Sequence, residues 1–214
     1  MKEVFLGIDV GSTSVKCVLL DKEGKIAGSV YLRNKGITES LVEALGRLAE
    51  VAGGGNGNGS EGSEGVARAT VEEIKIAACG ITGSGRHFAS LLVGADIVRT
   101  EVLAHTVAAL SFYPDVRTIF EIGGEDCKLM MVEDGALADF SMNSICAGGT
   151  GAMIEAIANR MGIPIEDVGE IALRSRNQLD LPGKCGIFCQ SAVVSKLNTG
   201  ADKSDILMGV CRAL

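Results

Sequence analysis

Two stretches of the chain carry the same pattern of acidic, glycine and lysine residues, and this internal repeat limits the possible folds more than any other feature. The stretches are GIDVGSTSVKCVLLDKEGKI and IFEIGGEDCKLMMVEDGAL. Three positions match at one constant spacing along the 214 residues: Asp9, Gly11 and Lys16 in the first copy, and Glu121, Gly123 and Lys128 in the second.

In each copy an acid-x-Gly turn joins two apolar strand-like runs, and a hairpin rich in Asp and Glu leads to a third run. Repetition on this scale predicts an α/β protein built from two similar halves. The alternative is chance similarity between two hairpins, because the turns of many folds select Gly and Asp.

The pattern of apolar residues gives the elements of the first half. Strands are predicted at 3–10, 15–20, 25–32 and 74–81, and helices at 37–52 and 101–110. We expect Thr38 to cap the first helix. The glycine-rich segment 53–65 contains no residue able to anchor a core, which predicts a flexible surface loop. The predicted halves are residues 1–114 and 115–214.

Charge and composition argue against some kinds of partner. The chain has 20 Lys and Arg against 27 Asp and Glu, so its net charge of −7 disfavours nucleic acid or an anionic membrane as a partner. The start, MKEVFLGIDV, has no signal-peptide pattern, and no apolar run approaches the ~20 residues of a membrane helix. We therefore predict a cytoplasmic protein whose seven cysteines are free thiols or metal ligands.

The two turns of the repeat have the residue types that bind a polyphosphate. Small residues let the backbone approach an anion, hydroxyl groups donate hydrogen bonds and a lysine adds positive charge. The candidate nucleotide-binding residues are Gly11, Ser12, Thr13, Ser14, Val15 and Lys16 in the first turn, with Gly123 and Gly124 in the second. Neither turn matches the Walker A or the G-x-G-x-x-G pattern.

Three acidic residues at these turns are candidate catalytic groups. Asp9 ends the first strand, where a carboxylate can hold hydrated Mg²⁺ through water. Glu121 and Asp126 stand at the second turn, where they would add metal contacts or orient an attacking water.

The motifs resemble those of known ATPases. DVGSTS followed by EIGGED is similar to the two phosphate motifs of the superfamily of actin, sugar kinases and heat-shock chaperone ATPases. The blocks GIDVGSTSVKCVLL, ITGSGR, TEVLAH, EIGGEDCK, SICAGGTGAMIEAIA and KCGIFCQSAVVSKL resemble the ATP-dependent activators of 2-hydroxyacyl-CoA dehydratases and the ATPase subunits of benzoyl-CoA reductase. The last two blocks are the specific ones, because the phosphate motifs alone would fit any kinase of the superfamily.

The resemblance implies an actin-type ATPase fold with two ribonuclease-H-like halves. Relatives continue into a strand with a glycine-rich adenosine motif, so the second half is expected to be incomplete at its C-terminus. Glu121 stands where many relatives have aspartate, and Glu125 where they often have glutamine. These departures leave open which residue orients the hydrolytic water.

The resemblance also implies an iron–sulfur cluster. In the family, the cysteine before A-[AG]-G-T-G and the cysteine before the F-x-x-S block ligate a 4Fe-4S cluster shared by two identical subunits, which assigns Cys146 and Cys185 here. A homodimer would supply the four thiolates that such a cluster needs. The helix after Cys146 would turn its first N–H groups and its dipole toward the cluster. Without the resemblance, both cysteines equally fit helix-start or reactive thiols.

Other candidate residues have simpler expected roles. Four cysteines are expected to pack as small apolar residues: Cys17, Cys79, Cys127 and Cys211. Cys189 is expected to be a neighbour of the cluster and not a ligand. We expect His105 to be a hydrogen-bonded structural residue, and Arg86 either to approach the nucleotide or to be solvated.

The resemblance thus implies an ATP-driven electron-transfer activator that uses ATP, Mg²⁺ and a 4Fe-4S cluster at a homodimer interface. It would take an electron from reduced ferredoxin or flavodoxin and pass it to an acyl-CoA dehydratase or reductase. Two alternatives stay open at this point. One is a sugar or acyl kinase of the same fold without a cluster, and the other is a non-catalytic cluster-binding fragment of a larger protein.

Overall fold

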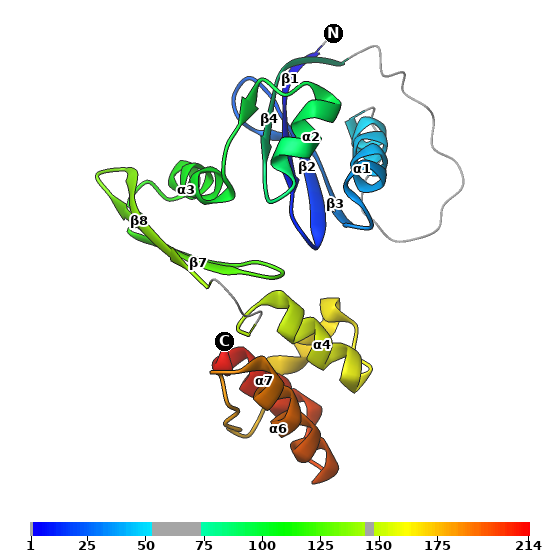
Figure 1. Cartoon of the computed structure of the whole chain (residues 1–214), viewed down its shortest axis with the longest axis vertical. Helices are drawn as coiled ribbons and strands as arrows, with labels where there is room; N and C mark the ends of the chain where they lie inside the picture. Colours follow the sequence, from blue (N-terminus) through cyan, green and yellow to red (C-terminus); the bar gives the residue numbers. More distant parts are fainter. Residues whose placement is uncertain (1, 53–73, 144–147) are drawn as a thin grey trace. The chain divides into compact units, whose positions relative to one another are not determined.

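The structure is a computed structural model that describes residues 2–52, 74–143 and 148–214 (Figure 1). Its contacts divide the chain into two compact units, Met1–Phe112 and Tyr113–Leu214. The predicted loop at 53–65 lies outside the described residues, and so does Cys146. No helix among the described residues is long and apolar enough to cross a membrane.

The first unit is built on a five-stranded mixed sheet. Its strands are β1 (Lys2–Val10), β2 (Ser14–Leu20), β3 (Ile26–Arg33), β4 (Ile74–Thr82) and β5 (Ile97–Val98), in the spatial order β3-β2-β1-β4-β5. The first three strands are antiparallel, while β4 runs parallel to β1, and β5 parallel to β4. The four predicted strands are confirmed.

Helix α1 (Ile37–Ala52) packs its apolar stripe against β2 and β3. Alternate residues of β1 supply the other side of this core, and the cluster includes Val4, Leu6, Ile8, Val10, Leu41, Ala44 and Leu48. The helix begins at Ile37, so the prediction that Thr38 caps it is wrong. The first unit also contains α2 (Arg86–Val93) and α3 (Glu101–Phe112).

The second unit combines a small sheet with a group of helices. The strands β6 (Thr118–Ile122), β7 (Cys127–Glu133) and β8 (Ala136–Met142) form an antiparallel sheet in sequence order. The helices are α4 (Gly151–Met161), a 3₁₀ turn (Ile165–Asp167), α5 (Val168–Ala172), α6 (Gly186–Asn198) and α7 (Lys203–Ala213). These helices enclose a separate apolar core around Ile157, Val193 and Ile206.

The internal repeat extends to individual hydrogen bonds. Asp9 on β1 lies opposite Lys16 on β2, and Glu121 on β6 lies opposite Lys128 on β7. In both hairpins the turn glycine donates its N–H to the carbonyl three residues later, at 2.9 Å in the first and 2.8 Å in the second. The shared geometry supports a true structural repeat over a chance similarity of composition.

Candidate functional site

The first candidate turn connects β1 and β2 and is held from one side by β3. A Cβ at Gly11 would lie 3.2 Å from the Ser14 carbonyl oxygen, so the tight turn favours glycine there. Asn34 donates its side-chain amide to the Gly11 carbonyl at 2.8 Å, and its backbone N–H to the Thr13 carbonyl at 3.0 Å. Asn34 is a supporting residue that the sequence analysis missed, because no local pattern links it to the turn.

The predicted nucleotide-binding residues of this turn are not equally accessible. Ser12 is exposed, and Thr13 and Lys16 are partly exposed. Ser14 and Val15 are buried, and the side chain of Val15 belongs to the apolar core. Any contact between a ligand and Val15 therefore involves its backbone alone.

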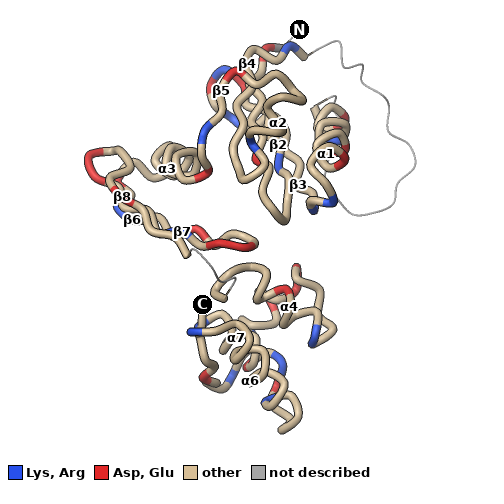
Figure 2. The backbone as a smooth tube through the Cα atoms, in the orientation of Figure 1, with Lys and Arg blue, Asp and Glu red and all other residues tan. Residues whose placement is uncertain are grey.

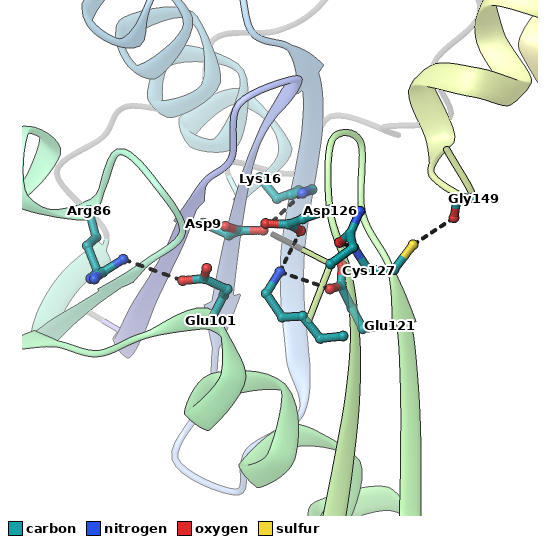
Figure 3. A network of polar contacts seen from close by, with 10 residues as sticks. Asp9, Lys16, Arg86, Glu101, Glu121, Asp126, Cys127 and Gly149 are labelled. Atoms are coloured by element: carbon teal, nitrogen blue, oxygen red, sulfur yellow. Dashed lines mark hydrogen bonds and ion pairs between the residues drawn. The ribbon is translucent and has the colours of Figure 1, made fainter. Parts of the chain in front are cut away.

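Asp9 and Lys16 form the ion pair of the first turn (Figure 3). The Lys16 ammonium lies 2.9 Å from Asp9 Oδ2, with the two side chains 41% and 23% exposed. A partly solvated pair of this kind contributes about 0–1 kcal/mol, so redirecting Lys16 to another anion costs little. This turn therefore offers a carboxylate and a mobile ammonium at its surface.

The loop after β4 packs directly on the end of β1. Gly83 has a φ of +92°, and a Cβ there would lie 2.4 Å from both Asp9 Oδ1 and the Val10 carbonyl oxygen. Gly85 donates its N–H to the same Val10 carbonyl at 2.8 Å. The backbone of the ITGSGR block thus contacts the candidate magnesium carboxylate, which only glycine at position 83 allows.

Arg86 connects this loop to the start of α3. Its Nη1 donates to the Gly83 carbonyl at 3.0 Å and lies 3.4 Å from Glu101 Oε2 (Figure 3). Both side chains are largely buried, so Arg86 is paired with protein groups and is not simply solvated. Glu101 is a second carboxylate at the carboxyl-terminal edge of the parallel strands, where sites of α/β proteins form. The sequence analysis did not name it as a site residue.

His105 follows Glu101 by one turn of α3. Its Nδ1 is buried, and no hydrogen-bond partner for this atom occurs among the described residues. The expectation of a hydrogen-bonded histidine is therefore not met at that nitrogen. The His105 ring contributes no contact to the candidate turns that the structure records.

The second candidate turn, between β6 and β7, is more acidic and more tightly packed (Figure 2). The Lys128 ammonium lies 2.6 Å from Asp126 Oδ1 and 3.1 Å from Glu121 Oε2, and its side chain is only 3% exposed. Burial acts to lower the pKa of Lys128, but the hydrogen bonds to Asp126 and Glu121 outweigh it and raise that pKa. A Cβ at Gly123 would lie 2.9 Å from Asp126 Oδ1 and 3.0 Å from Glu121 Oε1.

Helix α4 is attached to this second turn by its first backbone groups. The N–H groups of Gly151 and Ala152 donate to the carbonyls of Gly123 and Gly124, at 2.9 and 2.8 Å. The Cys127 thiol also donates to the Gly149 carbonyl at 2.7 Å. We expected the first N–H groups of this helix to face a cluster. These two instead bind the carbonyls of the phosphate turn, which lie within hydrogen-bond distance.

The described cysteines occupy different environments. Cys185 is the residue before α6 and is partly exposed, a position suited to a metal ligand. Cys189 is fully buried in the helical core, and burial raises the pKa of its thiol. Cys17 and Cys79 are in the core of the first unit, as predicted. Cys211 is exposed, so the expectation that it packs inside is wrong.

A complete metal site is not present in the part of the chain that the structure describes. No three His, Cys, Asp or Glu side chains come together there in a way that could hold a metal ion. Cys146 lies outside that part. The cluster and the magnesium ion are therefore argued further below as proposals.

Two units that share a hairpin with an acid–lysine pair over a glycine turn define a nucleotide-binding protein of the actin-like ATPase fold. A ROK family glucokinase from Streptomyces griseus in complex with glucose and AMPPNP shares this fold, with a TM-score of 0.50 at 14% identity over 99% of this chain and 75% of that one. The model of the BadF/BadG/BcrA/BcrD ATPase family matches residues 6–214. The chain belongs to this family, which confirms the resemblance found in its motifs.

Two relatives show what the chain is similar to within the family. The (R)-2-hydroxyglutaryl-CoA dehydratase activating ATPase of Acidaminococcus fermentans is 34% identical over 98% of this chain and 73% of its own length. The solved activator of the 2-hydroxyisocaproyl-CoA dehydratase from Clostridium difficile with bound ADPNP superposes with a TM-score of 0.82 at 27% identity. That match covers 98% of this chain and 71% of the solved one.

Proposed function

We propose that the chain is an ATP-dependent activator that delivers a low-potential electron to an acyl-CoA dehydratase or reductase. The electron would come from reduced ferredoxin or flavodoxin and pass through a 4Fe-4S cluster held at a homodimer interface by Cys146 and Cys185. ATP and water would be converted to ADP and phosphate during the transfer. The observation that carries the proposal is the attachment of α4 to the second phosphate turn.

The first turn supplies groups that suit nucleotide binding. Asp9 accepts hydrogen bonds from water in the coordination shell of Mg²⁺, an ion that would neutralise phosphate charge. Lys16 is partly exposed and only weakly held by Asp9, so its ammonium can turn to a phosphate oxygen. The backbone at Gly11 and the hydroxyl group of Ser12 complete a surface on which an anion can approach closely.

The second turn supplies the connection to the cluster. Because Gly123 and Gly124 accept the first N–H groups of α4, a shift of this turn moves the start of that helix. Cys146 stands just before α4 in the sequence, so nucleotide and cluster would be coupled through a short stretch of chain. A ligand changes the arrangement only by the difference in its affinity for the two states.

The proposed partner follows from the relatives. They are activators of the dehydratases of 2-hydroxyglutaryl-CoA, 2-hydroxyisocaproyl-CoA and lactoyl-CoA, and one is a subunit of benzoyl-CoA reductase. All of these names contain an acyl-CoA enzyme. We therefore assign the electron acceptor of this chain to the same chemical class.

Iron analysis tests the proposal directly. Protein purified without oxygen should contain about two iron atoms and two sulfides per chain, because one four-iron cluster is shared by two chains. Cys146→Ser and Cys185→Ser should each remove this iron. Cys211→Ser is the matched control, since Cys211 is exposed and has no proposed role as a ligand. Absence of iron after anaerobic reconstitution, with ATP-dependent phosphorylation of a small substrate, would favour the kinase reading.

A further inference from the structure

The two lysines of the repeat occupy equivalent positions but different environments. Lys16 is 41% exposed and contacts one carboxylate, that of Asp9. Lys128 is 3% exposed and contacts two carboxylates, those of Asp126 and Glu121. The repeat by itself predicts the same role for both lysines, and the structure separates them.

One substitution between the copies explains the difference. Asp126 of the second turn corresponds to Ser14 of the first, because each accepts the N–H of its turn glycine at its carbonyl. The serine leaves Lys16 with a single acidic partner, whereas the aspartate gives Lys128 a second one at 2.6 Å. The extra carboxylate compensates the charge of a lysine that has lost its contact with water.

The Lys128 ammonium also occupies the place that a divalent cation would need. Two carboxylates from adjacent strands converge on its Nζ, and carboxylate oxygens are the ligands that Mg²⁺ prefers. A dication close to this ammonium would be repelled, and the repulsion is strong where water is excluded. The residues of the second turn therefore do not fit a magnesium ion while Lys128 is in place.

We propose that Lys128 is a built-in counter-ion that positions Glu121 and Asp126 and keeps divalent cations out of the second turn. The magnesium ion that accompanies a nucleotide then depends on Asp9 of the first turn alone. This replaces the expectation that Glu121 and Asp126 add metal contacts. The inference deepens the proposed nucleotide site and rests on it only for the part that concerns the nucleotide.

Manganese binding to nucleotide-free protein tests the cation part, with free Mn²⁺ measured by its electron paramagnetic resonance signal. Asp126→Asn should leave the Mn²⁺ binding of the unmodified protein unchanged. Lys128→Met should create one new site, with a dissociation constant at least tenfold lower than any in the unmodified protein. Adding Asp126→Asn to Lys128→Met should remove that site, and Lys128→Arg, which keeps the charge, should not create it.

Lys16→Met is the matched control, because it removes the same charge from the equivalent position of the first copy. It should change Mn²⁺ affinity less than about twofold, since a single carboxylate remains there. Circular dichroism checks that each variant is folded. The inference is overturned if Asp126→Asn abolishes Mn²⁺ binding in the unmodified protein, an outcome that does not depend on the folding of any Lys128 variant. It is also overturned if folded Lys128→Met gains no site.

Titration with ATP separates this inference from the proposed function. If the unmodified protein binds no nucleotide, the proposed function fails while the manganese result stands. If it binds and hydrolyses ATP, Lys128→Arg should lower kcat at least tenfold and change nucleotide affinity less than twofold, because it misplaces the two carboxylates without touching the ligand. Equal loss of affinity and kcat would instead identify Lys128 as a nucleotide contact.

Discussion

At the residue scale, the end of β1 depends on a close approach that only one residue permits. Gly83 lies against Asp9 Oδ1 and the Val10 carbonyl, and its φ of +92° is in the region that favours glycine. This contact fixes where the Asp9 carboxylate lies. The orientation of a proposed magnesium ligand is thus set by a residue far from it in the sequence.

Gly83→Ala should therefore damage both stability and nucleotide binding. The new Cβ would lie 2.4 Å from two oxygen atoms, so the loop or Asp9 must move, at a cost of about 2 kcal/mol or more in the free energy of unfolding. Urea unfolding measures the first effect and nucleotide titration the second. Gly46→Ala is the control, since a Cβ there meets nothing within 4 Å and should stabilise α1 by about 0.5–1 kcal/mol. Equal stability of the two variants would contradict the structure.

Some residue roles followed from the sequence and others did not. The acid–lysine pairs and the buried Cys17 and Cys79 were predictable, because they depend on repeats and on apolar strand patterns. The burial of Lys128 was not, since both copies contain lysine and only the three-dimensional packing distinguishes them. Glu101 was missed for a similar reason, because its contact with Arg86 joins separate elements.

At the element scale, α7 is held to the rest of the helical group by one buried carboxylate. Asp205 Oδ1 accepts the backbone N–H groups of Arg176 and Asn177 at 2.8 and 3.0 Å, and the Ser175 hydroxyl group at 2.9 Å. Hydrogen bonds from Asn177 and Arg176 lower the pKa of Asp205 well below its usual range. The charged form is therefore the one that the folded protein stabilises.

Acid titration of stability should reveal this carboxylate. Because the folded-state pKa is lowered, its contribution is complete above the unfolded value of about 3.9 and is lost as the pH falls through the folded-state pKa. Asp205→Asn should therefore unfold at lower urea than the unmodified protein at pH 5–8, and the gap should narrow below about pH 4. Asp180→Asn, a change at an exposed aspartate, should show no such gap. A gap that is constant down to pH 2 would argue against the charge of Asp205 as its cause.

The elements themselves were largely predictable. The strands of the first unit and the helices starting at 37 and 101 lie where the apolar periodicity placed them. The start of α1 was not predicted correctly, since helix ends depend on local hydrogen bonds and Ser40 donates its N–H to the carbonyl of Gly36. The bonds from α4 to Gly123 and Gly124 also join parts of the chain that no periodic pattern relates.

At the scale of the whole molecule, the proposed function requires two chains. One chain provides two cysteines in suitable contexts, Cys146 and Cys185, whereas a 4Fe-4S cluster commonly has four thiolate ligands. A two-fold symmetric pair satisfies this count with a single interface. The cluster would then be both the redox centre and a link between the subunits.

The oligomeric state should therefore depend on iron. Anaerobic sedimentation of the iron-loaded protein should give twice the 22.1 kDa mass of one chain, and removal of iron by a chelator should shift the population toward the single-chain mass. Cys185→Ser should have the mass of the iron-free protein at any iron supply, while Cys211→Ser should behave as the unmodified chain. The shift follows from the loss of the shared thiolate bonds, so it should be reversed by reconstitution. An iron-loaded protein that sediments as one chain would show that a single subunit completes the cluster, and the shared-cluster proposal would fail even if the iron content were as expected.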